Sequence, residues 1–285
     1  MYDLKFESNT TGKVLFLNYE NDIIVSRVEG ATGTSVSLGL SQGYKQVGQS
    51  VIASTVGGMT LTIRGKILDA NTQKKQDLLK AFAPFSTGRL WWDNKYFVDV
   101  EVKDSPTITQ ERHSIFSFRL FSQSPFWSNG TLSSFTSGIS TAQFSFPVNY
   151  SSPHNFGSKD FSKEYNVYNS GSVDTVFELK IWGTEPVKNP KITNKKTGEF
   201  LRFIGDIETG ELLTMRQTAK AIYITKTAVD GTETNEFSML DDESSLFRLK
   251  TGDNVLINEA EEGIYSMVSK ISFYPLESGV LANGV

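Results

Sequence analysis

Few side chains in this sequence could carry out acid–base, nucleophilic or metal chemistry. There are two histidines, His113 and His154, and no cysteine. His113 follows Arg112, and His154 lies in a serine-rich stretch; neither has a nucleophile elbow or a second histidine at metal-ligand spacing nearby. Without cysteine, disulfides, zinc–thiolate sites, iron–sulfur clusters and cysteine nucleophiles are excluded. We therefore expect no catalytic residue, no bound metal and no cofactor.

Two acidic clusters are the remaining candidates for catalysis. They are Asp241-Asp242-Glu243 and the group Glu259, Glu261 and Glu262. Paired carboxylates can hydrolyse glycosides, so a cell-wall hydrolase using Asp241 and Glu261 is one alternative. Neither cluster has the alternating oxygen ligands and central glycine of a calcium loop. Charge runs of this kind usually lie in solvated loops, and this is the interpretation that we favour.

Aromatic and glycine residues could instead bind a ligand. The four tryptophans are Trp91, Trp92, Trp127 and Trp182. Tryptophan stacks on sugar rings, but in β-domains it more often lies in a core or an interface. Trp182 is the candidate glycan contact. Gly57-Gly58 precedes an apolar alternating stretch and no Walker pattern occurs, so a phosphate site is not indicated.

Composition favours a mainly β protein. Aromatic residues make up 12% of the 285 residues, and there are 20 Phe, 10 Tyr and 23 Gly, a mixture typical of β-sandwiches. The net charge of −4 indicates no basic field for nucleic acid. No stretch approaches the length of a membrane span, and residues 1–7 do not resemble a secretion signal. We therefore expect synthesis in a cytoplasm without a signal peptide.

The first half of the sequence shows the two-residue period of half-buried strands. In 115–122, Phe116, Phe118 and Leu120 alternate with Ser117 and Arg119. Pro125 cannot donate to a strand ladder and should end this strand. Similar alternation predicts strands at 13–17, 23–28, 59–67 and 98–103, with a turn at 18–22. Turn residues between aromatic ends predict a hairpin over 89–103.

One helix is predicted near 72–83. Asn71 is its expected N-cap, and Pro84 should stop it. The predicted apolar stripe consists of Leu78, Leu79 and Phe82. We expect this stripe to plug the core of the first domain, as in ordinary amphipathic helices.

Residues 30–58 form an unusual glycine-rich segment. It contains seven glycines, and apolar residues are scattered between them. A structureless loop of this length inside a compact domain is improbable. Two interpretations stay open: two short strands of the main sheet, or a protruding arm whose apolar residues a neighbouring copy covers. The arm residues would be Val36, Leu38, Leu40, Tyr44, Val47, Val51 and Ile52.

The second half is again a series of short strands with turns between them. Phe177, Leu179 and Ile181 alternate with Glu178 and Lys180. Turns are expected at 193–198, 230–231 and 250–254. A last strand before Pro275 should carry Tyr265, Met267, Ile271 and Phe273 on one face. This pattern predicts a sandwich or jelly roll.

Taken in order along the chain, these features resemble the distal tail protein (Dit) family of siphophages. The segments that carry the resemblance are the helix followed by Arg89-Leu90-Trp91-Trp92, the strand from Phe116 to Trp127, Asn169-Ser170-Gly171 ahead of the strand 177–183, and the turns at 193–198 and 249–254. We expect a ring-forming N-terminal β-sandwich-like domain with one helix and the arm at 1–128. A connector or start of the second domain would follow at 129–162, and a C-terminal galectin-like or jelly-roll sandwich at 163–285.

The resemblance implies a structural role in the virion tail tip or baseplate. It implies a homo-hexameric ring between the major tail tube protein and the tail-tip protein (a tail-associated lysin or fibre), with receptor-binding proteins as further partners in host adsorption. The arm would belt the neighbouring subunit, and DNA would pass through the ring without specific binding. The alternative from another functional class is a cell-wall glycan-binding module that uses Trp182.

Overall fold

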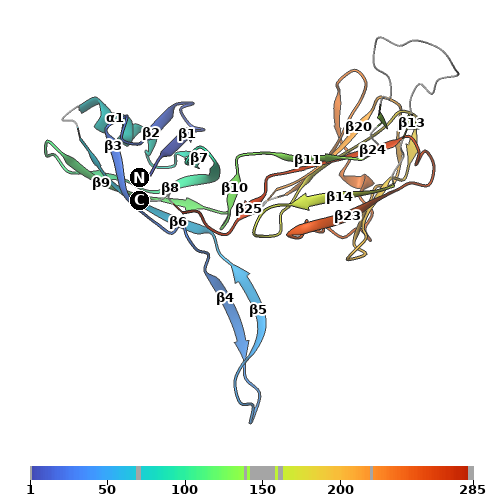
Figure 1. The fold of residues 1–285 in the computed structure, drawn as a ribbon, viewed down its shortest axis with the longest axis horizontal. Coiled ribbons are helices and arrows are strands. Elements are labelled where there is room, and N and C mark those ends of the chain that lie inside the picture. Colours follow the sequence, from blue (N-terminus) through green and yellow to red (C-terminus); the bar gives the residue numbers. More distant parts are fainter. Residues whose placement is uncertain are drawn as a thin grey trace, which may run out of the picture. The chain divides into compact units, whose positions relative to one another are not determined.

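The computed structural model describes residues 2–68, 72–137, 140–141, 158–159, 163–218 and 221–281 (Figure 1). The chain divides into two compact units. The first comprises Met1–Thr131 together with Leu276–Val285, and the second comprises Leu132–Pro275. Most of the predicted connector 129–162 lies outside the described residues. After Pro275 the chain returns to the first unit. The order of the sequence motifs did not predict this return.

The first unit is built on one nine-stranded antiparallel sheet. Its main path follows the order β2-β1-β7-β8-β9-β6-β3, and β10 pairs with both β8 and β25. The bounds are β1 Leu4–Ser8, β2 Val14–Leu17, β3 Ile23–Glu29, β6 Met59–Ile67, β7 Thr87–Trp92, β8 Tyr96–Ile108, β9 Ser114–Ser122, β10 Trp127–Asn129 and β25 Leu276–Glu277.

The sheet of the first unit curls, and its two end strands, which are consecutive in the sequence, lie close together in space. β2 and β3 lie at opposite ends of the strand order, but only Asn18 to Asp22 separate them. The backbone N–H of Ile23 donates to the Asn18 carbonyl at 3.2 Å, which closes the predicted turn. Because five residues span at most about 18 Å, the two end strands must lie close together, and the sheet encloses a core.

Strand β9 shows the predicted alternation of burial. Phe116, Phe118 and Leu120 are buried, whereas Ile115 and Arg119 are exposed. Phe118 lies opposite Ile63 of β6 in the register. The rings of Phe118 and Phe82 stack with centroids 4.2 Å apart. The predicted strand is confirmed, and its apolar face lies in the core.

Helix α1 spans Thr72–Ala81. Leu78 and Phe82 are fully buried, whereas Leu79 is 45% exposed. The prediction that Leu79 belongs to the apolar stripe is therefore wrong. Residues four apart lie on one helix face, and the residue after Leu78 is rotated away from it. The predicted cap Asn71 lies outside the described residues.

The predicted hairpin at 89–103 is confirmed by strands β7 and β8. Trp92 and Tyr96 are the last paired residues before the turn. Asp93 and Asn94 have φ angles of 51° and 50°. Two consecutive positive φ angles are the requirement of a type I′ turn, and Asn and Asp tolerate them better than most residues.

The second unit contains two larger antiparallel sheets. The six-stranded sheet has the order β11-β24-β15-β20-β21-β22, and the four-stranded sheet has the order β14-β23-β17-β18. The bounds are β11 Ser133–Thr136, β14 Glu164–Asn169, β15 Glu178–Gly183, β17 Lys191–Asn194, β18 Phe200–Arg202, β20 Leu212–Gln217, β21 Ile222–Thr227, β22 Glu233–Asn235, β23 Gly252–Glu259 and β24 Met267–Phe273. The pairs β12 Ser140–Thr141 with β13 Ser158–Lys159 and β16 Val187–Lys188 with β19 Asp206–Ile207 are smaller, and Phe237–Met239 form a 3-10 turn.

One buried cluster joins the two larger sheets of the second unit. Leu179 and Ile271 come from the six-stranded sheet, and Ile192 and Leu256 come from the four-stranded sheet. Two sheets that share a core in this way form a sandwich. The predicted fold class, mainly β with one α-helix, is therefore confirmed.

The predicted turns of the second unit lie where the glycines allow positive φ angles. These angles are 75° at Gly198, 86° at Gly231 and 85° at Gly252.

The prediction for the last strand needs correction. Tyr265 precedes β24 and is exposed, while Met267, Ile271 and Phe273 are buried on one face. The further strand β25 follows Pro275 and belongs to the first unit.

Two adjacent leucines of α1 test how the helix closes the core. We expect Leu78→Ala to lower the free energy of unfolding by about 2–5 kcal/mol, because it leaves a cavity in the core. The matched variant Leu79→Ala should cost less than about 1 kcal/mol, because the side chain is partly solvated. Urea unfolding followed by tryptophan fluorescence measures both. Equal losses would contradict the assignment of Leu78 alone to the buried face.

Candidate functional site: the arm and its root

Residues 30–58, called the arm below, leave the main sheet as a separate hairpin. Its strands are β4 Val36–Ser41 and β5 Ser50–Val56, and they pair only with each other among the described residues. Figure 1 shows them extending away from the sheet of the first unit. The sequence allowed either a protruding arm or two short strands of the main sheet. The structure has the protruding arm, because β4 and β5 lie outside the nine-stranded sheet.

One face of the arm is apolar. Val36 lies opposite Val56 and Leu40 lies opposite Val51 in the register. Because alternate residues of a strand share a face, Leu38 lies between Val36 and Leu40 on this side. Every residue of β5 is exposed, and so are Val36, Leu38 and Leu40.

The other predicted arm residues lie elsewhere on the hairpin. A bulge between Gly39 and Leu40 shifts the register, and Ile52 lies beside Gly39 on the opposite face, where a Cβ on that glycine would be 3.5 Å from Ile52 Cγ1. Tyr44 and Val47 lie at the tip and are almost fully exposed. The structure therefore brings Val36, Leu38, Leu40 and Val51 together on one face and separates Ile52 and the tip from them.

Hydrogen bonds of two side chains, Gln42 and Gln46, shape the tip of the arm. The backbone N–H of Gly43 donates to Gln46 Oε1 at 2.8 Å, and Gln46 Nε2 donates to Ser50 Oγ at 2.9 Å. Gln42 Nε2 donates to the Gln46 carbonyl at 3.2 Å. These bonds constrain the loop that presents Tyr44 and Val47 to solvent.

The arm is almost without charge. Lys45 is the one Asp, Glu, Lys or Arg residue in the sequence from 30 to 58. Natural edge strands are usually protected from pairing by charged side chains, proline or cover from another element. A two-stranded hairpin is also marginally stable by itself in water. The arm therefore has the properties of a segment that another protein surface covers.

Glycines allow the arm to leave the sheet at its root. Gly30 has a φ of 90°, and a Cβ there would lie 2.2 Å from the Thr60 carbonyl oxygen. At Gly58 a Cβ would lie 2.5 Å from the Ser122 carbonyl oxygen. Any side chain at either position would displace the backbone, so this path requires glycine.

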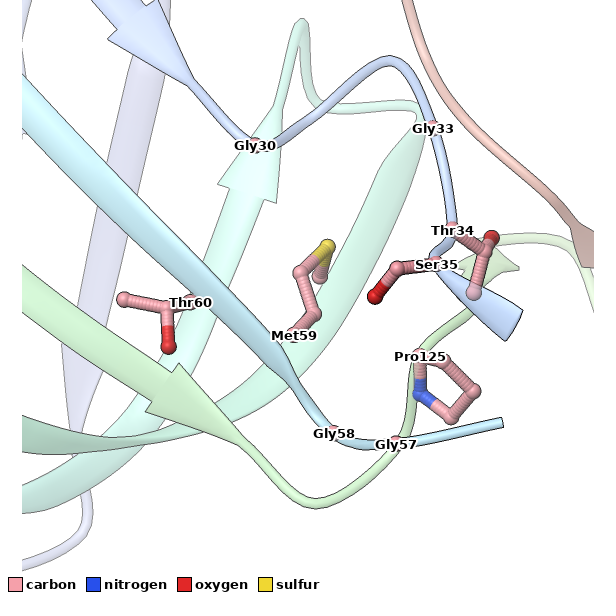
Figure 2. A pocket seen from close by; sticks show the side chains of 9 residues that line it. All are labelled: Gly30, Gly33, Thr34, Ser35, Gly57, Gly58, Met59, Thr60 and Pro125. Carbon is pink, nitrogen blue, oxygen red and sulfur yellow. The ribbon is translucent and has the colours of Figure 1, made fainter. Parts of the chain in front are cut away.

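A small pocket lies at the root of the arm. It has a volume of about 180 Å³ and is lined by Gly30, Gly33, Thr34, Ser35, Gly57, Gly58, Met59, Thr60 and Pro125. Figure 2 shows Pro125, from the segment after β9, close to the point where both sides of the arm enter the unit. The proline that follows β9 thus forms a wall of this pocket.

A second apolar surface of the first unit lies between β2 and α1. It is a groove of about 410 Å³ lined by Thr11, Lys13, Val14, Leu15, Asp77, Lys80, Ala81 and Ala83. β2 is an end strand that pairs only with β1 in the described chain. Phe85, on the segment after α1, is 94% exposed and has a φ of 65°. A bulky residue at positive φ is uncommon and costs backbone strain. Sequence reasoning did not indicate this surface.

The predicted acidic clusters are paired with cations. Asp241 accepts a hydrogen bond from the backbone N–H of Glu243 and contacts the guanidinium of Arg202. The bond from the Glu243 backbone, supported by Arg202, holds the pKa of Asp241 below its usual value. A glycosidase general acid needs a raised pKa. The geometry of Asp241 is that of a half-buried group paired with Arg202.

The second acidic cluster has the same character. Burial alone would raise the pKa of Glu259, but hydrogen bonds from Thr193 and Lys191 outweigh it and hold the pKa below its usual value. Glu262 pairs with Lys188 at 3.3 Å. Within the described residues, no group of three His, Cys, Asp or Glu side chains could hold a metal ion. No helix in that part of the chain is long and apolar enough to cross a membrane.

The histidines and tryptophans occupy separate places. His113 Nδ1 lies 2.9 Å from the Leu68 carbonyl oxygen, and His154 lies outside the described residues. Trp92 and Trp127 are buried in the first core with ring centroids 5.6 Å apart. Trp182 is half-buried on β15. Glycan contact at Trp182 stays a prediction.

A buried polar cluster in the second unit was missed by sequence reasoning. Asn258 Nδ2 donates to Ser137 Oγ at 2.6 Å, and Ser269 Oγ donates to Asn258 Oδ1 at 2.8 Å. Ser269 also lies 2.9 Å from the Tyr165 hydroxyl. Burial raises the pKa of Tyr165 above its usual range. The cluster joins β14 and β23 of one sheet to β24 of the other, and serine and asparagine carry no sequence signal that distinguishes such a position from a loop.

Comparisons with known proteins match both the second unit and the whole fold. Residues 170–269 match the model of the siphovirus-type tail component, C-terminal domain. The Dit protein (gp 19.1) of phage SPP1 superposes with a TM-score of 0.65 at 11% identity, covering 96% of this chain and 99% of that one. Two structures of the phage P2 baseplate in its activated conformation, with Ca and with Sr, have TM-scores of 0.50 and 0.51 at 12% and 13% identity. They cover 95% and 96% of this chain and 98% of each matched chain. Among curated proteins, none matches this chain.

These findings relate the chain to the tail components of siphoviruses, first through one domain and then through the whole fold. Residues 170–269 are a siphovirus-type tail component domain, and the chain as a whole has the Dit fold. The resemblance to the siphovirus distal tail protein family is thereby confirmed for the fold and for the matched domain.

Two serines of β24, Ser269 and Ser272, test the buried polar cluster. Ser269→Ala should lower the free energy of unfolding by about 1–3 kcal/mol, because it removes the hydroxyl that donates to the buried Asn258 Oδ1. Ser272→Ala removes the exposed Ser134–Ser272 contact of 2.9 Å and should change it by less than about 0.5 kcal/mol. Urea unfolding followed by circular dichroism compares the two variants, and equal effects would show that the cluster contributes no more than a surface contact.

Proposed function

We propose that this protein is the ring-forming hub of a phage tail tip or baseplate, a homo-hexamer that joins the tail tube to the tail-tip protein and to receptor-binding proteins. The observation that carries the proposal is the arm. It is an exposed, nearly uncharged hairpin with one apolar face, and its strands β4 and β5 pair with no other strand of the described chain. Such a surface is stable in solution when another chain covers it.

A closed ring of identical subunits needs two different surfaces on each subunit. Head-to-tail contacts are heterologous, and they close only when one surface fits the other on the next copy. The arm provides one surface. The groove between β2 and α1 is the second, because it is apolar and because β2 has an unpaired edge to which an extended segment can add. The occupant that we propose for this groove is the arm of the neighbouring copy.

The relatives support the place of the ring in a virion. The SPP1 protein is described as a paradigm of the hub adsorption apparatus in phages that infect Gram-positive bacteria, and the P2 structures are of a baseplate. By analogy, we place this chain at the tail tip, between the major tail tube protein and the tail-tip protein. The net charge of −4 supports a channel through which DNA passes without specific binding, since phosphate contacts come from Lys and Arg.

In this proposal the protein works by assembly and catalyses no reaction. The lowered pKa values of Asp241 and Glu259 support this, because they place both groups in the ionised form. The glycan-binding module is the alternative function, and binding of the intact protein to host cell-wall polysaccharide would test it. Saturable binding that Trp182→Ala abolishes would support that alternative.

Two adjacent residues of β4 test the proposed ring. Light scattering of the intact protein should give six times the mass of one chain. Leu38→Lys places a charge on the apolar face and should weaken association by more than about 2 kcal/mol. Ser37→Lys places the same charge on the opposite face of the same strand and should leave the hexamer intact.

The contradicting outcomes are distinct. Equal dissociation in Leu38→Lys and Ser37→Lys would contradict the assignment of the apolar face. A hexamer that survives deletion of residues 30–58 would contradict the role of the arm and leave the ring. A monomer at every concentration would contradict a ring that forms without tail partners and would favour the glycan-binding module.

A further inference from the structure

The last described segment of the chain, residues 276–281, lies along the root of the arm within the first unit. We call it the return segment. The backbone N–H of Val280 donates to the Ala31 carbonyl at 2.9 Å. Thr34 Oγ1 donates to the Ser278 carbonyl at 3.1 Å. Both contacts are made to the strand-free stretch between β3 and β4, at the base of the arm.

The return segment is itself held firmly in the first unit. Its residues Leu276 and Glu277 form β25 and pair with β10. Val280 is 3% exposed and belongs to the core of the first unit. Trp92 Nε1 donates to the Leu281 carbonyl at 3.3 Å. The segment is therefore anchored on both sides of its contacts with the arm.

The contact between the return segment and the arm root leaves no room for a side chain. A Cβ on Gly279 would lie 2.8 Å from the Thr32 carbonyl carbon and 2.9 Å from its oxygen. Real Cβ atoms do not approach backbone so closely, so any substitution must push the two segments apart. This close approach is the reason that position 279 requires glycine.

Other parts of the root would let the arm change direction. A Cβ on Gly33 or on Gly57 would meet no atom within 4 Å. Glycine populates more backbone conformations than any other residue, and the pocket of about 180 Å³ leaves space between the two sides of the root (Figure 2). Without a further contact, the hairpin could swing about these glycines.

We propose that the return segment positions the arm, with Gly279, Val280 and the Thr34–Ser278 hydrogen bond as the contacts that hold it in one direction. A hairpin held in one direction loses less conformational entropy when it docks than one that swings freely. The benefit to assembly rests on the proposed function, but the direction of the arm is a property of the single chain and is measured separately.

The absence of cysteine makes this measurement direct. Lys45→Cys places one spin label at the tip of the arm, and Lys66→Cys places another on the exposed face of β6. Electron–electron double resonance then gives the distribution of distances between the labels. Doubly labelled chains are diluted into unlabelled protein, so that pairs of labels within one chain give the signal whether or not the chains assemble.

The expected result is one narrow distance distribution in the parent protein, and a broadened or shifted one in Gly279→Ala and in Val280→Ala. Leu281→Ser is the matched control, because that side chain is 77% exposed, and it should leave the distribution unchanged. Circular dichroism checks that each variant is folded, and if Gly279→Ala is unfolded, Val280→Ala decides.

An unchanged distribution in the folded variants would overturn the inference. A broadened distribution in Leu281→Ser as well would also overturn it, because the effect would then not depend on the contacts with the arm. A parent protein that stays monomeric contradicts the proposed ring but leaves the distance measurement valid. The failure of one proposal is therefore distinguishable from the failure of the other.

Discussion

The exposed position of the arm depends on one constraint, the close approach of backbone to backbone at its root. Gly30 and Gly58 lie where a Cβ would collide with the carbonyl oxygens of Thr60 and Ser122. These contacts let the chain leave the sheet between β3 and β6, form a hairpin, and re-enter at the neighbouring strand. The sheet below continues with undisturbed pairing from β6 to β9. An apolar hairpin is thus carried by a rigid base.

The polar groups considered as candidate sites are paired within the chain. The carboxylates of Asp241 and Glu259 are ion-paired and have lowered pKa values, and the buried hydroxyls around Asn258 are paired with one another. Buried polar groups that are fully paired stabilise a unique arrangement of sheets. Two mainly apolar surfaces are not covered by other parts of the described chain: the face of the arm and the groove beside β2. This distribution supports the assembly function that we propose.

The Dit fold and the two-unit organisation also explain why similarity is clearer in structure than in sequence. The SPP1 protein shares 11% of its residues but nearly the whole fold. A sandwich core accepts many combinations of apolar residues as long as their alternation and total volume are kept. The arrangement of the strands therefore carries the similarity to the SPP1 protein, and most individual side chains differ.

The sequence by itself determined the elements whose signal is local. The alternation of Phe116, Phe118 and Leu120 predicts one buried strand face, and Asp93-Asn94 between aromatic ends predicts a hairpin, because strand period and turn geometry depend on neighbouring residues. Local signals failed where burial depends on distant partners. Leu79 and Tyr265 are residue types that are common in cores, but both side chains are exposed to solvent.

Only the tertiary structure decided which segments meet. The curling of the sheet, the pairing of Ser137 with Ser269 and the contact of Gly279 with Thr32 join residues that are far apart in the sequence. Contacts of this kind follow from the packing of whole sheets, and one sequence holds no local record of them. The same reason applies to the arm: its composition allowed either a protruding hairpin or two strands of the main sheet, and the fold showed that β4 and β5 pair only with each other in the described chain.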